Sequence, residues 1–132
     1  MDLSILLPDS QTLSLNHVVT RPASLWLEVT STMSGSVCPG CDRVANRIHS
    51  RYQRTLKDLS CCGRRVCLHL HVRRFFCDTP SCNQQIFCER LPGIVDVYRR
   101  VTRRLHDQCR QIALEVGAES AGRILHWIAQ PV

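Results

Sequence analysis

Aromatic residues and lysine are scarce in this sequence. Phe, Trp and Tyr together make up 5% of the 132 residues, and Lys57 is the single lysine among 17 Lys and Arg residues. With so few aromatic rings, Leu, Ile and Val must supply most of the core. A chain of this length fits one domain with a modest core, so a bound metal ion would add noticeably to its stability.

The start of the sequence lacks a basic leader and a long apolar run. The apolar run Ile5-Leu6-Leu7 stops at Pro8, which argues against a signal peptide and against a membrane span. Without export, the nine cysteines are not expected to form a disulfide framework, because thiols stay reduced inside a cell. Paired cysteines in a reducing compartment more often bind metal.

No arrangement of residues typical of catalysis is present. The sequence has no meaningful Ser-His-Asp order, no glycine-rich phosphate loop and no cluster of carboxylates suited to Mg²⁺. Its 11 Asp and Glu residues are scattered. We therefore expect a protein that is not an enzyme and that has no small-molecule substrate.

Four of the cysteines form two close pairs. Cys38 and Cys41 flank Pro-Gly, which allows a tight turn, and Cys77 and Cys82 flank a second short loop. Two such pairs joined by a β-hairpin are typical of a zinc ribbon, in which Zn²⁺ takes four thiolates tetrahedrally. Four protein ligands leave no open coordination position, so the predicted site holds one structural zinc ion.

The remaining cysteines leave alternatives open. Cys88 could replace Cys82 as the fourth ligand, while Cys109 lies on an apolar helical stripe and is predicted to fill the core. A second metal site is a further alternative, although its spacing matches no usual pattern. Its ligands would be Cys61, Cys62, Cys67 and His69.

Alternating residues predict the strands of an α+β fold. Residues 11–31 predict a β-hairpin with its turn at 20–23, and residues 51–60 predict a short strand or turn. A second hairpin arm is predicted from Arg64 to Phe76, with a bulge or strand end where two arginines are adjacent at 73–74. Its apolar face comprises Val66, Leu68, Leu70 and Val72.

Apolar residues recur at steps of three and four from Asp96 onward, which predicts an amphipathic helix that ends at Gly117. Its stripe comprises Val97, Val101, Leu105, Cys109, Ile112 and Val116. A second helix is predicted over residues 119–129, with an apolar face of Ala121, Ile124, Leu125 and Ile128. The chain thus divides into an N-terminal β-hairpin (1–36), a zinc ribbon (37–95) and a helical segment (96–132).

Positive charge is concentrated in the middle of the chain. Residues 43–110 carry 15 basic and five acidic side chains, a net charge of +10, while both flanks are acidic. Such a zone suits phosphate binding, because released counterions drive the association; a GC-rich genome is the other explanation for the arginine excess. His69 and His71 either contact phosphates or bases or belong to a solvated strand face. The predicted contacts with double-stranded DNA are Arg51, Arg54, Arg65, Arg73, Arg74, Arg99, Arg100, Arg103 and Arg104.

Several short segments of the sequence resemble the N-terminal zinc-ribbon region of ISL-three-type insertion-sequence transposases. They are Cys38-Pro-Gly-Cys41, VANRIHSRYQR at 44–54, TLKDL at 55–59, VRRFFC at 72–77, Cys82 and FCERLP at 87–92. The resemblance covers essentially the whole chain. It implies Cys38, Cys41, Cys77 and Cys82 as the zinc ligands, in a ribbon that precedes a helix-turn-helix and a large catalytic domain with three acidic metal ligands.

The sequence departs from that family in two places. The catalytic domain is absent and the family's recognition helix would follow Val132, so we expect a truncated module with an incomplete helix-turn-helix. A complete helix-turn-helix over residues 109–128 is the alternative, but Arg123 and His126 would then occupy positions that are normally apolar. Cys61-Cys62 also replaces a position that is usually aromatic-Gly, so the hairpin turn is expected to differ.

The resemblance further implies a role in transposition, a form of DNA recombination. The expected partner is the terminal inverted repeats of an insertion element, bound in the bacterial cytoplasm at the nucleoid. The alternative function is a non-catalytic remnant or regulatory module that pairs with full-length transposase or with itself.

Overall fold

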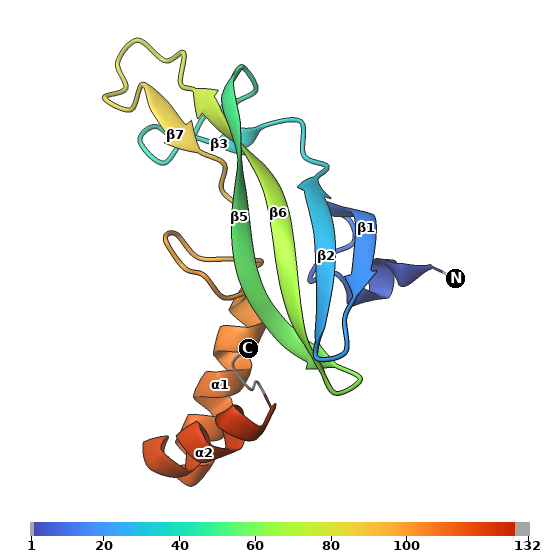
Figure 1. The fold of residues 1–132 in the computed structure, drawn as a ribbon. Helices are drawn as coiled ribbons and strands as arrows, with labels where there is room; N and C mark the ends of the chain where they lie inside the picture. Colours follow the sequence, from blue (N-terminus) through green and yellow to red (C-terminus); the bar gives the residue numbers. More distant parts are fainter. Residues whose placement is uncertain (1, 129–132) are drawn as a thin grey trace.

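The chain folds into a mixed sheet with two helices after it, the α+β class predicted from the sequence (Figure 1). The computed structural model describes residues 2–128, and the side chains of residues 2–126. Its elements are η1 (Leu3–Leu6), β1 (Leu13–Thr20), β2 (Ser24–Ser31), β3 (Ser36–Val37), β4 (Val44–Ala45), β5 (Ile48–Cys61), β6 (Arg64–Phe76), β7 (Ile86–Cys88), α1 (Arg103–Val116) and α2 (Ala118–Ile128).

The main sheet has the strand order β1-β2-β6-β5, with β7 paired to the end of β6. The β1–β2 and β5–β6 pairs are antiparallel hairpins, whereas β2 runs parallel to β6. The sheet therefore contains strands from both sides of the predicted boundary at residue 36. The division of the chain into segments 1–36, 37–95 and 96–132 stays a prediction.

The core lies on one face of this sheet. Val66, Leu68, Leu70 and Val72 are all buried, as their alternation predicts. They pack in one cluster with side chains from β1, β2 and β5, including Leu13, Leu27, Val29 and Leu56. Each such side chain contributes about 1.5–3 kcal/mol when fully buried. A smaller second cluster of Cys38, Phe75 and Phe87 lies under the cysteine loops.

Strand β5 is longer than the predicted segment 51–60, because it begins at Ile48 and ends at Cys61. Every second residue along most of this edge strand is exposed and is charged or polar. The polar side chains hide the strand in the sequence, because few apolar residues mark its alternation. The turn to β6 uses Cys62 (φ 52°) and Gly63 (φ 73°), both in the left-handed region that a two-residue hairpin turn requires. Strand β6 continues through residues 73–74, and the irregularities of this pairing lie instead in β5, between Ile48 and Ser50 and between Asp58 and Cys61.

The first helix begins seven residues later than predicted from Asp96, at Arg103. Thr102 is its N-cap, and the Thr102 hydroxyl accepts a hydrogen bond from the Leu105 amide at 3.3 Å. Val101 forms a β-bridge with Lys57 on the β5 edge, because the Arg100 carbonyl accepts from the Lys57 amide and the Thr102 amide donates to the Lys57 carbonyl. Val97 and Val101 are therefore not helical, and the predicted helical placement of Arg99 and Arg100 is wrong. Gly117 (φ 81°) ends the helix as predicted.

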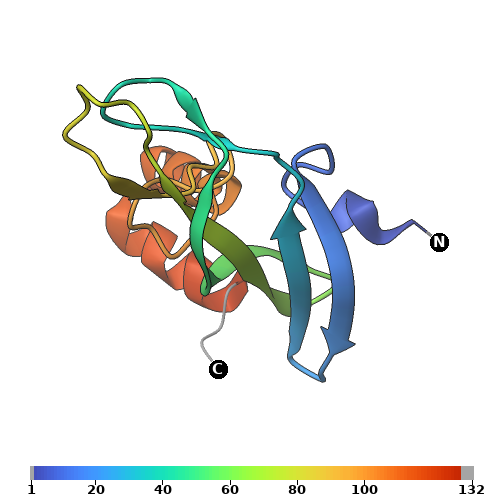
Figure 2. The same cartoon turned by 90° about the horizontal axis from the view of Figure 1, so that it is seen from above.

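The two helices lie beside the β5 edge of the sheet, on the opposite side from β1 (Figures 1 and 2). Ala121 of the predicted α2 face is buried, but Ile124 is exposed. The side chain of Ile128 and the predicted last residue, Ala129, lie outside the described part of the chain. Neither helix within residues 2–128 has the length and apolar character needed to cross a membrane.

Candidate metal centre

Two tight loops present the four predicted cysteines at the β7 end of the sheet. In the first loop, which joins β3 to β4, the Cys38 carbonyl accepts a hydrogen bond from the Asp42 amide at 2.9 Å. In the second loop, between β6 and β7, the Thr79 carbonyl accepts from the Cys82 amide at 3.1 Å. These backbone bonds turn each loop back on itself, so that both thiols of each pair point the same way.

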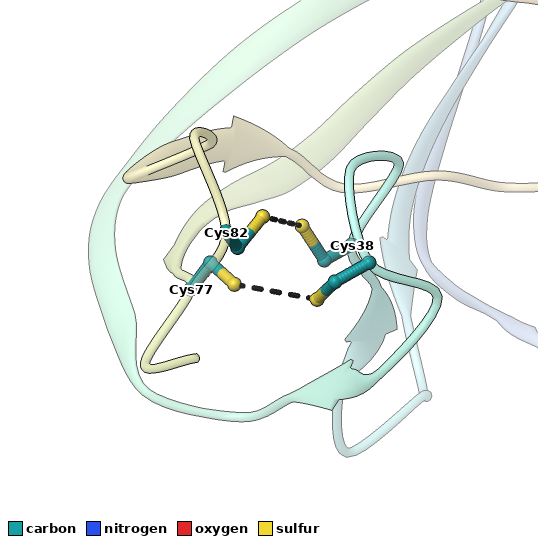
Figure 3. Close-up of side chains that lie close together, drawn as sticks. Cys38, Cys77 and Cys82 are labelled. Carbon is teal, nitrogen blue, oxygen red and sulfur yellow. Dashed lines mark hydrogen bonds between the residues drawn. The ribbon is translucent and has the colours of Figure 1, made fainter. Parts of the chain in front are cut away.

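The four sulfur atoms converge on one point between the loops (Figure 3). The Sγ atoms of Cys38 and Cys82 are 3.8 Å apart, and those of Cys41 and Cys77 are 3.6 Å apart. A tetrahedron of sulfurs around Zn²⁺ at about 2.3 Å has edges of about 3.8 Å. The donor set and its spacing therefore fit one zinc ion held by Cys38, Cys41, Cys77 and Cys82.

Backbone amides surround the sulfurs of this site. The Gly40 and Gln84 amides each lie 3.4 Å from a sulfur, of Cys38 and Cys82 respectively, and donate to it. Donors of this kind favour thiolate and so favour a bound cation. Gly40 is also required for space, because a Cβ added there would lie 2.8 Å from the Cys82 sulfur.

The metal-free thiols differ in acidity. The Thr79 hydroxyl, with the Arg43 amide, lowers the pKa of Cys41 to about 6. At Cys82 the Gln84 amide also lowers the pKa, but burial and the neighbouring thiols outweigh it and raise the pKa to about 12. A cation that binds all four sulfurs must therefore displace protons from the cluster.

The alternative cysteine ligands are placed elsewhere. Cys88 is exposed on β7, opposite Arg74 of β6. Cys61 and Cys62 are adjacent at the β5–β6 turn, and they do not gather with Cys67 and His69. Within the described chain, these cysteines take part in no group of three or more metal-binding side chains. Cys109 is partly buried on α1.

Three of the arginines predicted to bind DNA are paired with carboxylates. Arg73 lies 2.7 Å from Glu89, whose side chain is 1% exposed. Arg104 pairs with the buried Asp58, and Arg103 pairs on the surface with Asp96 and Asp107. The charges of Arg73 and Arg104 are therefore compensated by buried carboxylates within the fold.

The other predicted arginines gather, with one exception, around a groove of about 1190 Å³ beside β5 and β7. Arg54, Arg65, Arg74, Arg99 and Arg100 line it, and Arg51 does not. Two lining cations were missed from the sequence, Lys57 and Arg90. Arg90 follows β7 in a region whose pairing was not predicted, and Lys57 is brought beside Arg100 by the unforeseen bridge to residue 101.

Comparison with known families agrees with the cysteine geometry. Residues 34–82 match the family described as the zinc-finger of transposase IS204/IS1001/IS1096/IS1165. The matched range includes all four clustered cysteines, so a zinc-ribbon domain of this transposase family is present in the chain. No curated protein and no solved structure matches the chain.

Proposed function

We propose that this chain is a DNA-binding module of an insertion-sequence transposase and that it contacts the terminal repeats of its element. The observation that carries this proposal is the charge of the groove beside β5. Seven cations line it, and none of them forms an ion pair with a carboxylate of residues 2–126. They are Arg54, Lys57, Arg65, Arg74, Arg90, Arg99 and Arg100.

The acidic residues of the groove do not oppose this role. Asp58 and Glu89 also line it, but both are buried and each is bound to its own arginine. The net field of the groove is therefore positive. A surface of this kind attracts phosphates, and arginines without a carboxylate partner bind them without first breaking an ion pair.

Zinc has a structural part in this proposal. Four thiolates leave no position for water or substrate, so the ion does no chemistry on DNA. It would hold the loop that joins β6 to β7, and so support the β6–β7 pairing beside the groove residues Arg74 and Arg90. DNA binding should therefore require the zinc-loaded fold.

The expected contacts are mostly with the phosphate backbone, which gives affinity but little sequence preference. Helices α1 and α2 follow the groove, and we interpret them as an incomplete helix-turn-helix. Any preference for the terminal repeat would then come from these helices, since the zinc loops carry few basic side chains.

The test is binding of the zinc-loaded protein to a labelled duplex that carries the terminal repeat of the element, over a series of salt concentrations. We expect affinity to fall steeply with salt, with a slope of about −0.9 for each phosphate neutralised. A scrambled duplex of the same composition measures sequence preference. Absence of binding at low salt, from protein shown to be folded and to hold zinc, would overturn the proposal.

A regulatory module that pairs with full-length transposase is the second candidate function. Leu114 and Val116 on α1 are 70% and 45% exposed, which suits an apolar contact with another protein. Such a contact would change little with salt, whereas phosphate binding weakens. The same salt series, run with full-length transposase in place of DNA, separates the two functions.

A further inference from the structure

One carboxylate on the outer face of the sheet is held between two histidines. Glu28 Oε1 lies 2.6 Å from His69 Nδ1, and Glu28 Oε2 lies 2.7 Å from His71 Nε2. The imidazole rings are 5.6 Å apart, centre to centre. All three side chains are about one-third exposed, so they are open to a small ion but partly withdrawn from solvent.

The parallel pairing of β2 with β6 places these residues together. Glu28 is the register partner of His69, and Thr30 is the partner of His71. Their neighbours Leu27, Val29, Leu68 and Leu70 are buried in the core. By the alternation of a strand, Glu28, His69 and His71 must therefore project from the opposite face.

We propose that Glu28, His69 and His71 form a second metal site, separate from the four cysteines, which binds Zn²⁺ or a similar divalent transition ion. Their three donor atoms lie within 4.8 Å of one another. Ligand atoms around Zn²⁺ are separated by about 3.3 Å, given bonds of about 2.0–2.1 Å to nitrogen and oxygen. Small side-chain rotations would therefore open the present contacts enough to admit an ion.

The donor set selects the class of metal. Two imidazoles and one carboxylate suit Zn²⁺, Co²⁺ or Ni²⁺, whereas Mg²⁺ and Ca²⁺ prefer oxygen ligands alone. Three protein ligands also leave at least one coordination position for water. The site thus differs in kind from the closed site of four thiolates.

A neighbouring amide is placed to orient one of the ligands. Gln53 Nε2 lies 3.4 Å from His71 Nδ1, the ring nitrogen that faces away from Glu28. If the Gln53 amide turns over, its oxygen accepts a hydrogen bond from His71 Nδ1–H, and this tautomer leaves the Nε2 lone pair free for the ion. Partners of this kind are typical around metal-bound histidines. Any proton between a histidine and Glu28 is released to solvent or moves to the other ring nitrogen as the ion binds.

The experiment uses full-length protein whose cysteine site is already filled with Zn²⁺. Added Co²⁺ should give one further equivalent with weak visible absorption and without the intense ultraviolet thiolate-to-metal band that cobalt at the cysteines produces. H69Q and H71Q should each weaken this second binding at least tenfold, because even the loss of an outer-shell partner costs about 10–100-fold. Added Mg²⁺ should not compete.

H106Q is the matched control, because His106 also lies beside a carboxylate, that of Asp107, but belongs to no group of three metal-binding side chains within the described residues. It should leave the cobalt affinity unchanged. E28Q keeps side-chain size and should lose the second equivalent while the protein stays folded by circular dichroism. A folded protein that binds only one metal ion, or a second ion that H69Q and E28Q do not affect, would overturn the site. Neither result depends on DNA binding.

Discussion

The guanidinium of Arg104 covers the carboxylate of Asp58, a side chain with no solvent exposure. Arg104 Nε donates to Asp58 Oδ1 at 2.8 Å, and the Thr102 hydroxyl donates to the same oxygen at 2.7 Å. Arg104 also donates to the carbonyl oxygens of Leu6 and Leu7. This one side chain therefore joins the N-terminal turn, strand β5 and the start of α1.

Loss of Arg104 should consequently destabilise the whole fold. R104A leaves a buried carboxylate without its main partner, and we expect the free energy of unfolding to fall by about 3 kcal/mol. R103A is the control, because it removes a neighbouring arginine with exposed ion pairs only, which should cost less than about 1 kcal/mol. Urea unfolding followed by circular dichroism measures both. Similar losses for the two variants would contradict the role of Asp58.

Removal of zinc should unfold one end of the molecule before the other. The cysteine loops rest on a small cluster of Cys38, Phe75 and Phe87, which is separate from the main core. With a chelator present, we expect faster amide hydrogen exchange in β3, β4, β7 and the two loops, while the centre of β6 stays protected. Re-addition of Zn²⁺ should restore protection. Uniform loss of protection along β1, β2 and β6 would show instead that zinc supports the entire fold.

Substitution of Gly40 should weaken zinc binding specifically. In G40A the new methyl group meets the Cys82 sulfur at 2.8 Å and Gln84 Cβ at 3.1 Å, so the two loops must separate. We expect at least a tenfold loss of zinc affinity, measured by competition with a chromogenic chelator. G122A is the matched control, since nothing lies within 4 Å of its added Cβ in α2. It should leave zinc affinity unchanged and add up to about 1 kcal/mol of stability. Equal zinc affinity in both variants would contradict the close packing at Gly40.

The groove arginines should set the salt dependence of DNA binding. R99A/R100A removes two exposed positive charges. These two residues support the fold through their backbone hydrogen bonds, which alanine keeps. We expect the slope of log affinity against log salt to become shallower by about 0.9 per lost phosphate contact. R103A/R123A removes the same charge from arginines that already have carboxylate partners, and should change the slope less. Equal effects would mean that net charge, rather than the groove, governs binding.

Local patterns predicted the parts of this structure that depend on neighbours in sequence. The cysteine spacing identified the four clustered thiols, and the alternation from Val66 to Val72 identified the buried face of β6. The predicted start of α1 was wrong because Val97 and Val101 fit a helical period. In the structure, the backbone of residues 100–102 instead forms hydrogen bonds with the edge of the sheet. Thr102, a favourable N-cap residue, was the signal that could have corrected it.

Long-range pairing set the limit of what could be predicted. The contact of Glu28 with His69 and His71 depends on the parallel β2–β6 register, which no local period encodes. The ion pair of Asp58 with Arg104 also depends on tertiary structure, because it forms only when the β5 edge packs against the start of α1. Opposite charges far apart in sequence are common, so neither pair is visible before the fold is known.

The parallel register of β2 and β6 also has a kinetic consequence. The β5–β6 hairpin closes locally through Cys62 and Gly63, but β2 ends at Ser31 and β6 begins only at Arg64. Their pairing must wait until the intervening chain has looped back, which is the slow kind of event in folding. A zinc ion held by the four cysteines would join the loop after β3 to the loop after β6, and would thereby shorten the search that brings β2 alongside β6. The metal supply would then control how fast newly made chains reach the native state as well as how long they remain in it.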